Sequence, residues 1–148
     1  MVRSLSAEEA ELGGLLEVLR DEQQSLLERD FRKVAALTPA KEKRLAALGA
    51  LGNMRGRTLR QMGLAVDGGG MNTLLAASAV LKQAWMRVHQ LAQEARHLNQ
   101  VNGSLIGAQM RFVEGALGAL QRNGVRFTTY GADGQKRGAL ARHSLASA

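Results

Sequence analysis

Two histidines and the glutamate between them, His89, Glu94 and His97, are the residues best suited to bind a metal. Ligands on a helix must be three or four residues apart to share one face. Glu94 and His97 have this spacing, but no third ligand follows at a helical interval. We therefore predict no metal site and no cofactor, and we interpret both histidines as surface or core residues.

The residue types of a catalytic site are present but do not converge. A hydrolytic triad needs a serine, a histidine and an acid that meet in space, whereas the acids crowd into the first 30 residues and most serines lie near the ends. Gly68-Gly69-Gly70 lacks the Lys-Ser or Lys-Thr of a phosphate-binding loop. We predict that the protein is not an enzyme and takes no small-molecule substrate.

The composition predicts an all-α protein. The 148 residues suit one domain, and 45% are hydrophobic although only 3% are aromatic. One proline and many Ala, Leu, Arg, Glu and Gln residues favour long helices. The sequence contains no cysteine, no apolar signal-peptide core and no apolar run near the roughly 18 residues that span a membrane. We therefore expect a cytoplasmic protein.

Charge is distributed unevenly along the chain, whose formal net charge is +7. Residues 5–37 carry eight acids and four bases, whereas residues 38–63 carry six bases and one acid. An acidic helix followed by a basic one can pair as an antiparallel hairpin. The alternative is a basic helical protein that binds nucleic acid through phosphate contacts, but no aromatic residues are interleaved with these bases.

Leucine periodicity predicts the first two helices. Leucines at 5, 12, 19 and 26 indicate one helix over about 6–37, with a capping box formed by Ser6 and Glu9. Thr38-Pro39 then predicts a boundary, because proline is favoured at the first position of a new helix. A second helix over about 39–63 contains Gly49, Gly52 and Gly56 in its interior and is expected to fray near Gly52-Asn53.

A flexible glycine loop over 66–70 is expected to precede a third helix over about 72–123, with Asn72 as its N-cap. Fifty residues correspond to roughly 75 Å, too long for a compact bundle, so part of it must project or pair in a coiled coil. Residues 124–148 are expected to form an extended or disordered basic tail. The predicted fold is an elongated antiparallel bundle or coiled coil of about three helices, with residues 1–123 as one helical domain.

Four residues on the predicted third helix, at 85, 102, 103 and 107, are open to more than one interpretation. Trp85 lies on the apolar stripe, as a buried anchor between helices or as a contact for a partner. Asn102 either fixes the register of a coiled coil or, with Gly103, marks a kink. Gly103 and Gly107, one turn apart, would let a second backbone approach closely. The long seam also leaves open whether the protein self-associates.

Two motifs resemble the signature of the FlgN family of flagellar export chaperones. The first is Leu98-Asn99-Gln100-Val101-Asn102-Gly103, followed by Leu105-Ile106, and the second is Tyr130-Gly131-Ala132-Asp133-Gly134-Gln135. Trp85, fourteen residues before Asn99, and Lys41 with Leu45-Ala46-Ala47-Leu48 also resemble the family. The glycine-rich second helix and the basic charge depart from it.

The resemblance implies a cytoplasmic chaperone. It would bind the hook–filament junction proteins FlgK and FlgL, keep them unassembled and deliver them to the flagellar type III export gate, so that it meets the membrane only through that apparatus. The resemblance places substrate binding in the C-terminal part and implicates Tyr130 in docking on the gate protein FlhA. From the stripe, we expect a substrate helix to lie against these residues: Leu105, Ile106, Met110, Val113, Leu117 and Leu120.

Overall fold

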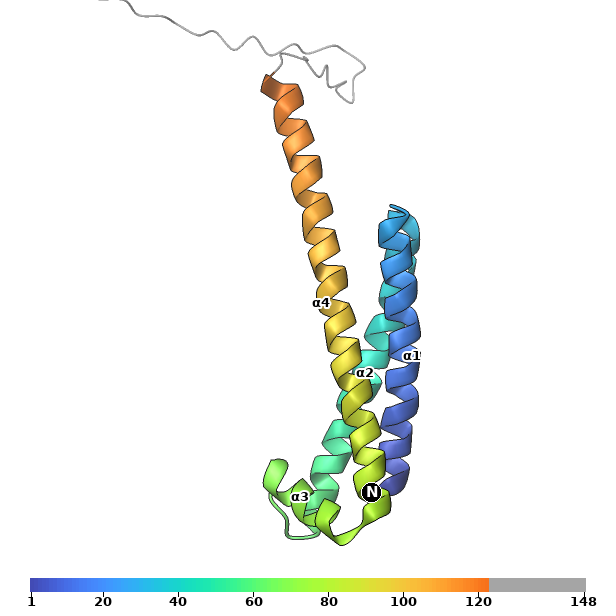
Figure 1. Ribbon diagram of the computed structural model, residues 1–148, viewed down its shortest axis with the longest axis vertical. Helices are drawn as coiled ribbons and strands as arrows, with labels where there is room; N and C mark the ends of the chain where they lie inside the picture. Colours follow the sequence, from blue (N-terminus) through green and yellow to red (C-terminus); the bar gives the residue numbers. More distant parts are fainter. Residues whose placement is uncertain (123–148) are drawn as a thin grey trace, which may run out of the picture. The chain divides into compact units, whose positions relative to one another are not determined.

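A computed structural model describes residues 1–122, which form four helices (Figure 1). They are α1 (Val2–Leu27), α2 (Phe31–Gln61), α3 (Gly68–Ala77) and α4 (Ala79–Arg122). Every element of this described part is helical, which confirms the all-α class, with four helices in place of about three. The chain forms two compact units, Met1–Gly107 and Ala108–Ala148. The predicted domain boundary at 123/124 stays a prediction.

The first helix ends ten residues earlier than predicted. Arg29 adopts a left-handed conformation (φ 60°), its N–H donates to the Leu26 carbonyl (3.2 Å), and the Asp30 N–H donates to the Ser25 carbonyl (2.9 Å). The Asp30 side chain then accepts from the Lys33 N–H at 3.0 Å and begins α2. The range 6–37 was wrong because no glycine or proline marks this turn; the helix also begins at Val2 without the predicted capping box.

The predicted boundary at Thr38-Pro39 is also wrong, because Pro39 lies inside α2. The Thr38 hydroxyl donates to the Val34 carbonyl (3.3 Å), one turn earlier in the same helix, instead of accepting from an N–H group at the start of a new helix. The helix also continues through Gly52-Asn53, where we expected it to fray. It ends where Gly63 turns left-handed (φ 71°) and donates its N–H to the Arg60 carbonyl.

Three residues of the glycine loop expected over 66–70, Gly68 to Gly70, instead form the first turn of α3. Asp67 caps α3 by accepting from the Gly70 N–H at 3.0 Å, so Asn72 is not a cap. A β-carbon on Gly70 would lie 2.0 Å from the Ala65 carbonyl oxygen, so this backbone approach requires glycine. Ser78 then interrupts the predicted third helix with an extended conformation and accepts from the Leu81 N–H at 3.3 Å, which starts α4.

The core of the first unit forms along one face of α1. Leu5 and Leu12 cluster with Leu81 and Val88 of α4, and further along α1 a second cluster adds Ala95 of α4. Residue numbers rise together in these contacts, so α1 and α4 run in the same direction. The short turn at 28–30 makes α2 antiparallel to α1. Met71 brings α3 into the first cluster.

Replacing Pro39 with alanine tests the continuity of α2. Proline in a helix interior removes one hydrogen bond and costs up to about 3 kcal/mol relative to alanine. We therefore expect Pro39→Ala to raise the free energy of unfolding in urea, and Thr38→Ala to change it little. If Pro39→Ala instead left the free energy of unfolding unchanged and Thr38→Ala lowered it by about 1 kcal/mol, a new helix would begin at Pro39 with Thr38 as its cap.

Candidate functional site

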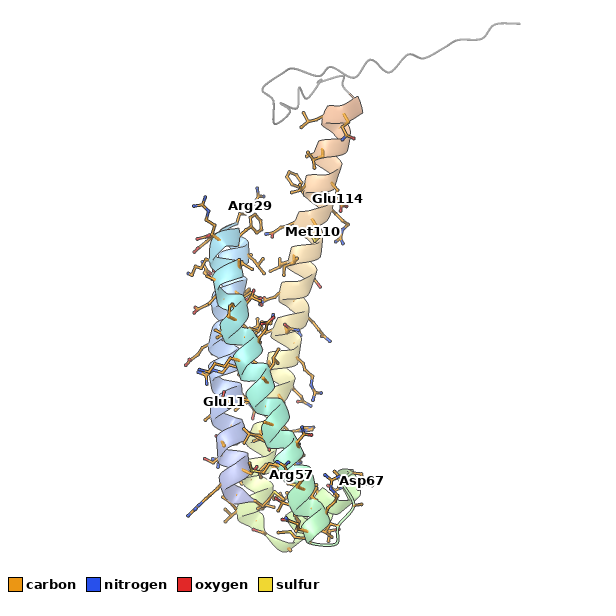
Figure 2. All side chains as sticks on the ribbon, turned by 180° about the vertical axis from the view of Figure 1, so that it is seen from behind. Glu11, Arg29, Arg57, Asp67, Met110 and Glu114 are labelled. Carbon is orange, nitrogen blue, oxygen red and sulfur yellow. The ribbon has the colours of Figure 1, made fainter. Side chains whose placement is uncertain are left out.

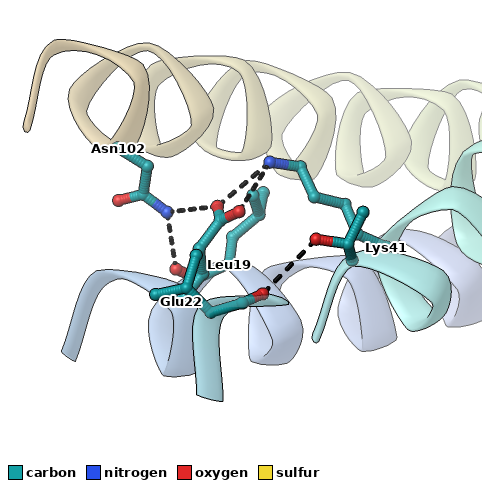
Figure 3. A network of polar contacts seen from close by, with 6 residues as sticks. Leu19, Glu22, Lys41 and Asn102 are labelled. Carbon is teal, nitrogen blue, oxygen red and sulfur yellow. Dashed lines mark hydrogen bonds and ion pairs between the residues drawn. The ribbon is translucent and has the colours of Figure 1, made fainter. Parts of the chain in front are cut away.

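Asn102, from the first family motif, is the centre of a buried polar network that joins three helices (Figure 3). Its Nδ2 donates to the Leu19 carbonyl (2.9 Å) and to Glu22 Oε2 (2.8 Å), both on α1. Lys41 Nζ of α2 donates to both oxygens of Glu22 at 3.0 Å. We call these four residues the Asn102 network. Since Asn102 is 1% exposed and bonded across helices, the register interpretation is supported.

The predicted pairing of an acidic first helix with a basic second one is confirmed. Besides Glu22–Lys41, ion pairs join Glu11 to Arg44 (2.9 Å) and Glu8 to Arg55. Three of the six bases in residues 38–63 are thus bound to carboxylates of α1. These bases are not available for phosphates, which removes much of the basis for the nucleic-acid alternative.

Trp85 fits the interpretation as an anchor between helices, although it is only partly buried. It is half-buried and packs against the core cluster that contains Leu5 and Val88. The Arg55 guanidinium carbon lies 5.1 Å from the centre of its ring, a cation–π contact, and the His89 ring lies 5.8 Å away. Because Arg55 of α2 also pairs with Glu8 of α1, Trp85 of α4 packs on a side chain that joins the other two helices.

The other residues of the first motif lie around Asn102 in different environments. Leu98 packs against the second core cluster, whereas Asn99 is exposed. Gly103 is exposed, and a β-carbon there would meet no atom within 4 Å. The close backbone approach expected at Gly103 is therefore absent from the described residues.

The predicted substrate stripe is exposed. In the first unit, Leu105 is half-buried and Ile106 is 36% exposed. In the second unit, the last turns of α4 carry a row of apolar side chains that are each 42–58% exposed. Met110, the first of them, is labelled in Figure 2. We call this row the α4 stripe, and its members are Met110, Val113, Leu117 and Leu120. Their alternating spacing of three and four residues places them on one face of the helix.

Sequence reasoning missed an apolar groove in the first unit. It has a volume of about 220 Å³ and is lined by α1, α2 and α4. No periodicity signals it, since it arises where small α4 residues face leucines of the other two helices. Its lining residues are Leu12, Leu15, Leu19, Lys41, Leu45, Leu48, Ala92, Ala95, Arg96 and Asn99.

The second family motif, with Tyr130, Gly131, Asp133 and Gly134, lies outside the described residues. Within residues 1–122, no three side chains of metal-binding type come together. None of the helices in this part combines the length and the apolar character that crossing a membrane requires.

Comparison with known proteins relates the chain to a protein family and to a curated relative. The model of one protein family, described as FlgN protein, matches residues 1–138. The chain is also similar to the Flagella synthesis protein FlgN of Proteus mirabilis, with 30% identity over 135 residues, which cover 90% of this chain and 87% of the relative. No solved structure matches the chain.

The Asn102 network can be tested through Lys41. Its partner Glu22 has a side chain that is only 6% exposed, so Lys41→Met leaves a buried carboxylate unpaired and should cost about 3 kcal/mol of unfolding free energy. Arg20→Ala is the control, because the Arg20–Glu94 pair is 58% and 46% exposed and its loss should cost at most about 1 kcal/mol. Equal costs in urea denaturation would contradict a structural role for the network.

Proposed function

This chain belongs to the FlgN family, and from that premise we propose that it is a flagellar export chaperone. It binds the hook–filament junction proteins FlgK and FlgL in the cytoplasm, prevents their premature assembly and delivers them to the export gate protein FlhA. It acts by binding alone, without catalysis or a cofactor.

The exposure of the α4 stripe is the observation that carries this proposal. A single-chain protein normally buries large apolar side chains that share a helical face, and an exposed row of them marks a binding surface. A helix of the substrate with its own apolar face would cover the row in the helix-in-groove manner. The substrate would thus lose the surface through which it polymerises.

The energetics require more than the stripe. Each of its four side chains is about half exposed, so covering one contributes roughly 1 kcal/mol, about half of the value for full burial. Four such contacts supply about half of the 8 kcal/mol that a micromolar complex needs, before ordering costs. We therefore expect the substrate to contact residues beyond the stripe, including Leu105 and Ile106.

Leu117→Glu tests the stripe. A carboxylate in the middle of the apolar contact should weaken binding to FlgK and FlgL at least tenfold in calorimetry, because it must be desolvated without a partner. Ala119→Glu is the matched control, since it adds the same charge to the same helix away from the stripe, and it should leave affinity nearly unchanged. If the native chain binds neither substrate, the chaperone proposal fails.

Tyr130→Ala tests the division of roles that we propose between the stripe and the second motif. The variant should bind FlgK and FlgL as the native chain does but lose binding to the cytoplasmic part of FlhA, measured by pull-down with a purified chaperone–substrate complex. A parallel loss of substrate and gate binding would show that Tyr130 does not act separately.

A further inference from the structure

The apolar groove of the first unit has the form of a site for another helix. Its floor is Leu12, Leu15 and Leu19 of α1, and Leu45 of α2 remains 50% exposed at its edge. On the α4 side the lining residues include alanines at 92 and 95, which leave room that larger side chains would fill. A volume of about 220 Å³ is below the range of roughly 300–1,000 Å³ for small-molecule pockets and suits inserted side chains.

The rim of this groove is basic. Its two charged lining residues are Lys41 and Arg96. Lys41 is bound to Glu22, but Arg96 is exposed and forms no ion pair among residues 1–122. An occupant should therefore carry an apolar row with an acid beside it, so that the acid meets Arg96.

The α4 stripe of this same chain has these features. Glu114, labelled with Met110 in Figure 2, follows Met110 by four residues and precedes Leu117 by three, so it lies beside the stripe. Glu114 is exposed and forms no ion pair within the described part of the chain. Within residues 1–122, the chain thus contains an apolar groove beside Arg96, a base without an ion pair, and an exposed apolar row beside Glu114, an acid without an ion pair.

We propose that the α4 stripe of one copy occupies the apolar groove of a second copy, with Glu114 of the one paired to Arg96 of the other. The exchange is reciprocal, so a twofold dimer makes each contact twice and leaves no stripe uncovered. Homodimerisation in this manner protects the stripe from non-specific association. This consequence rests on the proposed function: a substrate helix and the second copy of the chain compete for the α4 stripe.

Sedimentation velocity over a concentration series tests the dimer. The native chain should show a monomer–dimer equilibrium, and Ala92→Leu, which fills the groove, should raise the dissociation constant at least tenfold. Arg96→Glu and Glu114→Arg should each weaken the dimer, and the double variant should restore it, because the charge pair is re-formed in reverse. Lys43→Glu, which makes the same charge change on an exposed base outside the groove, is the control.

A monomer at every concentration would overturn the proposal, as would a dimer that Ala92→Leu and both charge reversals leave intact. Arg96 is exposed, so its reversal should not disturb folding, and circular dichroism checks each variant. Calorimetry with FlgK separates this inference from the proposed function. If the dimer behaves as described but no FlgK binds, only the chaperone role fails; if FlgK binds and no dimer forms, only the groove assignment fails.

Discussion

Two buried carboxylates on α1 determine how the first unit is assembled. The side chains of Glu8 and Glu22 are 7% and 6% exposed, and a charge at this depth is tolerated only if it is paired. Their partners, Arg55 and Lys41, lie on α2, so the antiparallel hairpin can form in one register only. A rotation of α2 by one residue, about 100°, would turn these bases away from both acids.

Asn102 extends the same principle to α4. A core of leucine and alanine gives little directional information, because such side chains pack in several registers at similar cost. The amide of Asn102 donates hydrogen bonds to Glu22 and to the Leu19 carbonyl. Only one register of α4 against α1 allows both bonds, so that register is favoured. One carboxylate, Glu22, thus contacts side chains of both other long helices. The exposed apolar side chains of α4 have no part in this alignment.

The sequence predicts the features that follow from pattern and charge. The all-α class, the pairing of acidic and basic segments and the inward position of Asn102 all follow from helical spacing and Coulomb attraction. The turn at 28–30 could not be foreseen, because Arg29 takes a conformation that normally indicates glycine. Gly68 to Gly70 were misread as a loop, since the cap from Asp67 and the contact with Ala65 become visible only in three dimensions. The groove forms where small side chains of α4 face α1 and α2. The residue pattern of one helix cannot predict it, because it depends on how three helices are aligned.

Trp85 gives the molecule a built-in optical reporter. It is the chain's single tryptophan and belongs to the unit Met1–Gly107. Its indole packs under Arg55 and beside His89, so its emission depends on whether α1, α2 and the start of α4 stay together. Fluorescence therefore reads the integrity of the helical hairpin with no competing signal from other indoles, and it distinguishes a variant that has lost a contact surface from one that has lost its fold.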